Sequence, residues 1–217
     1  MTGAATTAPR MVAGIDIGTL TCRLLIAEVS SSRHLREVRS DRRILRLGEG
    51  VDKDRVLRAD AMARVVATLK EWRQIIDAYQ VEVTAVVATS AVRDAGNRQE
   101  FLELIARETG LQVEIISGEE EARRTMLGVR SGLPADIAGI LALDIGGGST
   151  ECILDRPGHL PVVRSMDIGV VRLGERVLKS DPPAAGELQQ ARHWIRNETE
   201  AAVATMPLTP GLTCIGT

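Results

Sequence analysis

Residues 141–151 have the sequence LALDIGGGSTE, in which an apolar run ends at Asp144 and three glycines follow before Glu151. Because apolar residues then resume, the pattern predicts a strand, a tight turn and a second strand. Glycines in such a turn permit positive φ and leave backbone N–H groups uncovered, and these groups can converge on an anion. Carboxylates beside the anion would repel it unless a metal cation lay between them. The stretch therefore indicates a site for phosphate and a divalent cation.

The same pattern occurs a second time near the start of the chain. Residues 14–19 (GIDIGT) share with residues 143–146 (LDIG) an apolar residue followed by Asp, Ile and Gly. One glycine-rich turn is equally compatible with a plain hairpin. Two copies far apart indicate two domains of like topology, each of which offers its turn to a shared cleft. We therefore expect Asp16 and Asp144 to face each other across that cleft.

The composition is that of an ordinary globular protein, with 44% hydrophobic and 26% charged residues among 217. The formal net charge of −2 provides no basic field, so nucleic acid is not an expected partner. No segment approaches the roughly 18 apolar residues of a membrane helix, and residues 1–10 lack the apolar centre of a signal peptide. We expect a cytoplasmic protein with reduced, buried thiols at Cys22, Cys152 and Cys214.

Apolar periodicity along the chain predicts an α/β fold. Helical spacing at residues 59–79 predicts a packing helix, and the β-branched run at residues 81–88 predicts a central strand. Asn97 and Glu100 have the spacing of a capping box and predict the start of another helix. A glycine and a proline within residues 131–138 indicate a linker.

This linker divides the chain into an expected first domain at residues 11–132 and an expected second domain at residues 138–217. The second unit ends on a new strand at residues 212–215, followed by Gly216 and Thr217. We therefore expect the second domain to be incomplete in this sequence.

Six arginines occur between Arg33 and Arg46, with only Glu37 and Asp41 to offset them. One interpretation is a solvated edge strand whose charges discourage pairing with another chain. The other is a basic surface that binds a polyanion. The sequence leaves both open.

Two further residues are candidates for chemistry. Ser117 and Glu120 have capping-box spacing, which accounts for the acids in the first turn of a helix but does not require Glu121. Glu121 is therefore free to project into a cleft and orient water. Arg93 lies between a predicted strand and a predicted helix, where α/β folds place ligand contacts. The alternative for Arg93 is a surface pair with Asp94.

These motifs together resemble the exopolyphosphatase and guanosine pentaphosphate phosphohydrolase family, which belongs to the actin-like superfamily. The resemblance extends from Val12 to Thr217, and the order and spacing of its motifs favour this family over kinases of the same fold. It implies two ribonuclease-H-like domains around an interdomain cleft that binds phosphate and Mg²⁺ or Mn²⁺. The motifs are Gly14–Leu25, Arg46–Val51 (RLGEGV), Ala88–Asn97 (ATSAVRDAGN), Ile115–Ala122 (IISGEEEA) and Leu143–Glu151 (LDIGGGSTE).

The resemblance also implies roles for individual residues. Glu121 is similar to the general base that orients the attacking water, and Arg93 is similar to the phosphate-binding arginine. Asp144 and Glu151 match the carboxylates that hold the metal, with Asp16 in support from the other domain. The residues that match the phosphate cradle are Gly18, Thr19, Thr21, Gly146, Gly147, Gly148 and Ser149.

The implied reaction is hydrolysis of the terminal phosphoanhydride of inorganic polyphosphate or of guanosine pentaphosphate, and the motifs do not separate these substrates. A third hypothesis is a phosphate-binding or nucleotide-binding regulatory module with a weakened site. It arises because Leu20 stands where the family usually has asparagine in the first loop, and because the second domain is expected to be incomplete. A kinase is a more distant alternative, since it would need a full nucleotide pocket. A homodimer is left open, and no membrane partner is expected.

Overall fold

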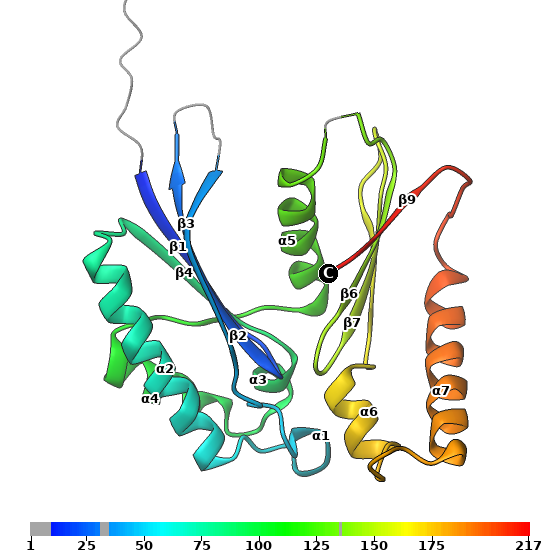
Figure 1. The fold of residues 1–217 in the computed structure, drawn as a ribbon, viewed down its shortest axis with the longest axis horizontal. Coiled ribbons are helices and arrows are strands. Elements are labelled where there is room, and N and C mark those ends of the chain that lie inside the picture. Colours follow the sequence, from blue (N-terminus) through cyan, green and yellow to red (C-terminus); the bar gives the residue numbers. More distant parts are fainter. Residues whose placement is uncertain (1–9, 31–34, 135) are drawn as a thin grey trace, which may run out of the picture.

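The computed structural model describes residues 10–30, 35–134 and 136–217. Within these residues the strands form two sheets, of five and four strands, each with its own hydrophobic core. We call the first sheet with helices α1–α4 the first lobe, and the second sheet with helices α5–α7 the second lobe. The two lobes stand side by side (Figure 1).

The first sheet has the order β3-β2-β1-β4-β5. Strands β1 (Arg10–Ile17), β2 (Thr21–Val29) and β3 (Leu35–Ile44) are antiparallel neighbours. Strands β4 (Val83–Ala88) and β5 (Glu114–Ile115) run parallel to β1. The first glycine turn and the loops after β4 and β5 therefore lie at one edge of the sheet, where open α/β sheets bind ligands.

Helices α2 (Ala59–Ala78) and α4 (Arg98–Thr109) lie on one side of the first sheet, and the second lobe lies on the other (Figure 1). Trp72 and Phe101 from these helices are fully buried in the core. The short helices α1 (Val51–Asp54) and α3 (Ser90–Asp94) lie at the end of the lobe that carries the turn.

The second sheet repeats this arrangement in the order β8-β7-β6-β9. Strands β6 (Ile140–Ile145), β7 (Thr150–Asp155) and β8 (Val162–Met166) are antiparallel neighbours, and β9 (Thr213–Gly216) runs parallel to β6. A hairpin, a third antiparallel strand and a parallel strand thus occur in the same order in both sheets. This confirms the expected α/β fold with two units of like topology.

Three helices accompany the second sheet in the described part of the chain: α5 (Gly118–Ser131), α6 (Val170–Arg176) and α7 (Ala185–Val203). Helices α5 and α7 lie on opposite sides of the sheet (Figure 1). Ala122 and Met126 of α5 pack in one cluster with strands β6 and β7. The expected linker at residues 131–138 follows α5, whereas this packing favours a division of the chain before α5.

Several expectations are met or corrected by the local structure. Strand β3 is an edge strand, as one interpretation of the arginine run predicts; Arg33 lies outside the described residues. Ser117 caps α5 by accepting a hydrogen bond from the Glu120 N–H, as expected. Asn97 precedes α4, but its side chain binds the backbone of Leu57 instead of capping the helix.

Two further expectations concern the cysteines and membrane-spanning helices. Cys22 and Cys152 are buried, but Cys214 is exposed on β9, so the expectation of three buried thiols is wrong. Its strand lies at the edge of the second sheet, where apolar sequence context does not guarantee cover. Among the described helices, none has the length and hydropathy needed to span a lipid bilayer.

Candidate active-site cleft between two glycine turns

The two glycine turns close in the same way and meet each other. The Gly18 N–H donates to the Thr21 carbonyl at 3.0 Å, and the Gly146 N–H donates to the Ser149 carbonyl at 2.9 Å. A Cβ atom placed on Gly147 would lie 3.0 Å from the Cβ atoms of Leu20 and Thr19. None of Gly146, Gly147 and Gly148 has a positive φ. The other lobe therefore leaves little room for a side chain at Gly147 and Gly148, and φ does not account for glycine at these positions.

A cavity of about 210 Å³ lies between the two turns. It brings together most of the residues that the sequence predicts for the site. The first lobe supplies Asp16, Gly18, Thr19 and Thr21, helix α5 supplies Glu121, and the second hairpin supplies Asp144, Gly146, Gly147 and Ser149. Of the predicted site residues, Arg93, Gly148 and Glu151 do not line this cavity.

Glu121 lies in the first turn of α5, and its side chain is 19% exposed. Its Oε2 atom is buried and has no hydrogen-bond partner among the described residues. Burial raises the pKa of Glu121 to about 8, and the charge of Glu151 adds to this effect while Arg93 opposes it. The carboxylate therefore lies in a site where negative charge is under-compensated.

Three further carboxylates surround Glu121. Burial raises the pKa of Asp16 to about 6, with Arg23 opposing, and the Asp16 Oδ1 atom has no hydrogen-bond partner among the described residues. Burial also raises the pKa of Glu151, which accepts a hydrogen bond from Ser165 at 2.7 Å. Asp144 accepts one from Thr125 at 3.0 Å. The site is a cluster of acids contributed by both lobes.

This cluster has the donor chemistry of a hard divalent cation, because its ligands are carboxylate oxygens and two of them are buried without partners. Uncompensated acids of this kind are stabilised by a cation among them. The described residues contain no group of three or more His, Cys, Asp or Glu side chains already arranged around one point. The residues thus fit Mg²⁺ or Mn²⁺ by chemistry, and the ligand set Asp16, Asp144 and Glu151 stays a prediction.

Arg93 lies in α3, a helix that the sequence pattern did not predict. Its Nη1 atom donates to the Ile116 carbonyl at 2.9 Å and lies 3.7 Å from Glu121 Oε2. Asp94, the expected surface partner of Arg93, binds Arg172 instead, at 2.6 Å. The structure therefore turns Arg93 toward the candidate base, and the surface-pair interpretation is wrong.

The model of the Ppx/GppA phosphatase family matches residues 25–217. The chain belongs to this family. Exopolyphosphatase 2 of Mycobacterium tuberculosis is 39% identical over 215 residues, which cover 94% of this chain and 66% of the relative. The chain thus spans slightly less than two thirds of that protein.

Solved structures agree with this assignment. The crystal structure of an exopolyphosphatase-like protein is 36% identical, with a TM-score of 0.89 over 97% of this chain and 66% of its own. The Ppx/GppA family member of Aquifex aeolicus is also 36% identical, with a TM-score of 0.75 over 96% of this chain and 66% of its own. MreB 5 of Spiroplasma citri, at 16% identity and a TM-score of 0.50, shares the fold alone.

In this Ppx/GppA chain the strand register adds two arginines to the site: Arg23, to which the sequence assigned no role, and Arg42, which belongs to the arginine run considered as a polyanion surface. Asp16 of β1 pairs with Arg23 of β2, and Arg23 pairs with Arg42 of β3. The three side chains thus form one row across the sheet, from the cavity toward its edge. Neither arginine forms a salt bridge among the described residues, although the charge of Arg23 acts on the neighbouring Asp16, and both arginines line the cavity. The alternation of side chains along each strand does not reveal this row by itself, because the row depends on which residues pair across the strands.

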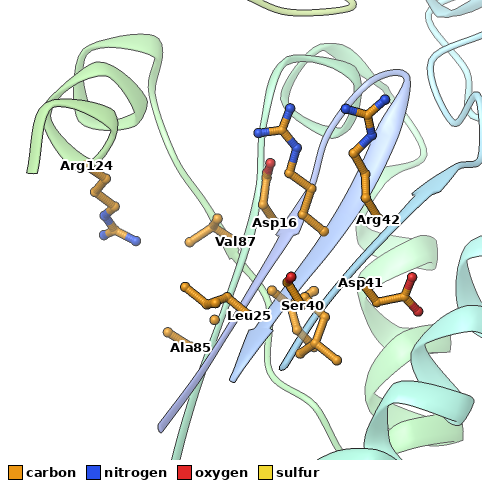
Figure 2. Close-up of a pocket in the computed structure, with 12 residues that line it drawn as sticks. Asp16, Leu25, Ser40, Asp41, Arg42, Ala85, Val87 and Arg124 are labelled. Atoms are coloured by element: carbon orange, nitrogen blue, oxygen red, sulfur yellow. The ribbon is translucent and has the colours of Figure 1, made fainter. Parts of the chain in front are cut away.

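A second cavity, of about 520 Å³, continues from the first and shares Asp16, Arg23 and Arg42 with it. Figure 2 shows Leu25, Ala85 and Val87 along this cavity, with Arg124 of α5 on its far side. Its floor is therefore apolar. Arg23 and Arg42 bring positive charge to it, whereas Arg124 is paired with Glu114 and Glu120. The cavity extends the cleft along the face of the first sheet that is turned toward the second lobe.

The arginines on β3 differ in their contacts: some form ion pairs on the surface, and one lines the cleft. Arg36 pairs with Glu28 on the neighbouring strand, and Arg43 pairs with Glu71 of α2 at 2.7 Å. Arg42 lines both cavities. The run as a whole is thus a charged edge strand, and Arg42 is the part of it that faces the cleft.

Proposed function

We propose that the chain forms the catalytic cleft of a phosphoanhydride hydrolase that releases the terminal phosphate of inorganic polyphosphate. The observation that carries this proposal is the meeting of Glu121, Asp16 and Asp144 with both glycine turns on one cavity. The similarity to a relative named Exopolyphosphatase 2 supports the substrate class.

Substrate binding rests on the turns and on positive charge. The terminal phosphate would lie between the Gly18–Thr21 and Gly146–Ser149 turns, where backbone N–H groups suit an anion. Arg93 would neutralise charge on this phosphate, and Arg23 and Arg42 would bind the phosphates behind it. Phosphoryl transfer needs positioning and charge neutralisation more than covalent chemistry, so these contacts supply most of what the reaction requires.

Glu121 would act as the general base. Its Oε2 atom has no hydrogen-bond partner among the described residues and faces the guanidinium of Arg93 at 3.7 Å. A carboxylate with a free oxygen beside the bound phosphate can accept a proton from water and orient that water for in-line attack.

Asp16, Asp144 and Glu151 are the residues that would hold Mg²⁺ or Mn²⁺. When bound, the cation supplies neutralisation of phosphate oxygens and favours the ionised form of the surrounding carboxylates. Thr125 and Ser165 each donate a hydrogen bond to one of these acids and so fix its orientation.

Guanosine pentaphosphate is the second candidate substrate. It is favoured by the larger cavity, whose apolar floor at Leu25, Ala85 and Val87 suits a base and whose arginines suit phosphates. A regulatory module that binds without turnover is the third candidate, because Leu20 occupies the contact between the turns. A cytoplasmic location and a homodimer stay predictions.

The deciding experiment measures phosphate release from long-chain polyphosphate and from guanosine pentaphosphate side by side, with Mg²⁺ and with a chelator. Glu121→Gln provides the background, and Glu119→Gln, an exposed acid two residues away, provides the matched control. We expect Mg²⁺-dependent release from polyphosphate that Glu121→Gln loses and Glu119→Gln keeps. Release from guanosine pentaphosphate alone would select the second substrate, and release from neither would support the regulatory module.

A further inference from the structure

One buried arginine of the second lobe joins three separate parts of the molecule. Arg172 of α6 has a side chain that is 7% exposed. Its Nε atom donates to the Gly148 carbonyl in the second glycine turn. Its Nη1 and Nη2 atoms donate to Asp52 of α1 and Asp94 of α3, both at 2.6 Å. The guanidinium therefore ties the turn of the second lobe to two helices of the first.

Neighbouring residues of α6 strengthen the same junction. Arg176, one helical turn further, also binds Asp52, and Glu175 accepts a hydrogen bond from the Gly50 N–H at 2.7 Å. Two arginines thus face two aspartates of the other lobe, and Glu175 adds a third acid to the junction. We call Gly50, Asp52, Asp94, Arg172, Glu175 and Arg176 the interlobe cluster.

The RLGEGV motif, which the catalytic proposal does not use, positions the first-lobe side of this cluster. Leu47 is fully buried, and a Cβ on Gly48 would clash with Thr19 Cγ2, so the segment packs directly on the first turn. Gly50 has a φ of 81°, a conformation that favours glycine. This backbone course brings the Gly50 N–H and Asp52 to α6.

The cluster is also connected to the candidate catalytic residues. Asp94 follows Arg93 directly in α3. At the other end of that helix, Ser90 Oγ lies 2.7 Å from Thr19 Oγ1 in the first turn. Arg172 therefore holds the Gly148 carbonyl of one turn against the helix that carries Arg93 and contacts the other turn.

We propose that Arg172 is a positioning residue that fixes the distance between the second glycine turn and Arg93, so that both engage the same phosphoryl group. This inference rests on the proposed hydrolase function. Its physical basis is the buried pairing of Arg172 with two acids of the other lobe, because removing one partner from such a pairing leaves charge buried and unpaired. Small displacements of positioned groups cost phosphoryl-transfer rate while leaving much of the substrate binding in place.

The chain offers a matched control in Arg130. This arginine of α5 pairs with Asp155 at 2.6 Å and donates to the Ile137 and Ala138 carbonyls, all within the second lobe. Arg130→Met and Arg172→Met each remove a guanidinium group that binds both carboxylate and backbone carbonyl oxygens. Of the two, only Arg172→Met removes contacts between the lobes.

The first test compares kcat and KM for phosphate release. Arg172→Met should lower kcat by roughly 10- to 100-fold, the cost of a misplacement of about 1 Å, with a smaller change in KM. Arg172→Lys should recover part of the loss, and Arg130→Met should keep wild-type kcat per folded molecule. Should Arg172→Met fold poorly, Asp94→Asn removes the same pair with near-identical shape and should show the same fall in kcat.

The second test asks whether the pair acts as a unit. Once Arg172→Met is in place, Asp94→Asn should have little further effect on kcat, because the contact that Asp94→Asn disrupts is already absent. Multiplication of the two separate effects in the double variant would overturn the proposal. So would wild-type kcat in both single variants.

The third test is independent of activity. Spin labels at Arg107→Cys on α4 and Arg192→Cys on α7, in a Cys214→Ser background, report the distance between the lobes; all three positions are exposed. The distance distribution should broaden in Arg172→Met and stay narrow in Arg130→Met. An unchanged distribution overturns the positioning role. If the wild type released no phosphate from either substrate, the proposed function would fail, and this measurement alone would decide the cluster's role.

Discussion

Glu121 Oε2 lies 3.7 Å from Arg93 Nη1, although the two residues belong to helices that pack in different lobes. This distance allows electrostatic attraction but is too long for a hydrogen bond. The carboxylate oxygen therefore remains available to another donor, such as a water molecule. We therefore expect substitution of Glu121 to lower kcat and substitution of Arg93 to raise KM.

Glu121→Gln should lower kcat by roughly 10²- to 10⁴-fold, the usual range for a lost general base, with little change in KM. The amide keeps the shape of the side chain but cannot accept the proton. Steady-state phosphate release measures both constants. Wild-type turnover in this variant would remove Glu121 from the role of base.

Arg93→Ala should chiefly raise KM, by about 10- to 100-fold, since hydrogen bonds to charged groups contribute about 1.5–3 kcal/mol. Arg107→Ala, an exposed arginine on α4, should keep the wild-type KM. The measurement is a substrate titration at fixed Mg²⁺. An unchanged KM in Arg93→Ala would show that this arginine does not contact the phosphate.

Arg42→Gln should weaken binding of long polyphosphate more than binding of tripolyphosphate, because Arg42 stands furthest from Asp16 in the row of paired side chains. Arg43→Gln is the matched control, since this neighbour pairs with Asp41 and Glu71. Competition of the two polyphosphates for the cleft, at two ionic strengths, measures the difference. Equal effects of the two substitutions would contradict the assignment of Arg42 to the substrate path.

Mg²⁺ should raise the Tm of the protein, because a ligand that binds only the folded state adds about 2.7 kcal/mol of stability at 100 times its Kd. Asp16→Asn and Asp144→Asn should lose most of this rise. Glu103→Gln, an exposed acid on α4, should keep it. Thermal unfolding across a Mg²⁺ titration makes the comparison. A rise of the same size in all variants would place the cation elsewhere.

The stabilising contribution of Asp52 should be lost at acid pH. Its hydrogen bond with Arg176, together with the charges of Arg176 and Arg172, lowers the pKa of Asp52 in the folded protein. A lowered folded-state pKa stabilises the protein above the unfolded value of about 3.9, and this stability is lost as pH falls through the folded pKa.

Asp52→Asn should therefore be less stable than wild type at pH 7, and the difference in unfolding free energy should narrow below about pH 4. Urea unfolding at a series of pH values measures this difference. Asp54→Asn, an exposed acid on the same short helix, should track the wild type throughout. A difference that stays constant down to the lowest pH would show that the ionised form of Asp52 is not what stabilises the fold.

The sequence predicted the two hairpins and the start of α5 because these features depend on neighbours within a few residues. Glycines between two apolar runs make a turn wherever they occur, and Ser117 caps the helix with an N–H three residues away. The repeated hairpin also predicted the shared cleft, and Asp16 and Asp144 do line one cavity. The structure was needed to show that close approach of the lobes, and not φ, accounts for glycine at positions 147 and 148 of the second turn.

By itself, then, the sequence determined the hairpins, their turns and the acids that follow from the motif. Only the tertiary structure decided that α5 packs on the second sheet, that Arg23 and Arg42 extend the row from Asp16, and that Arg172 joins the lobes. The partners of Arg172 lie 24, 78 and 120 residues away along the chain. Local patterns carry no information about such contacts, because strand register and lobe packing are set by the joint burial of distant segments.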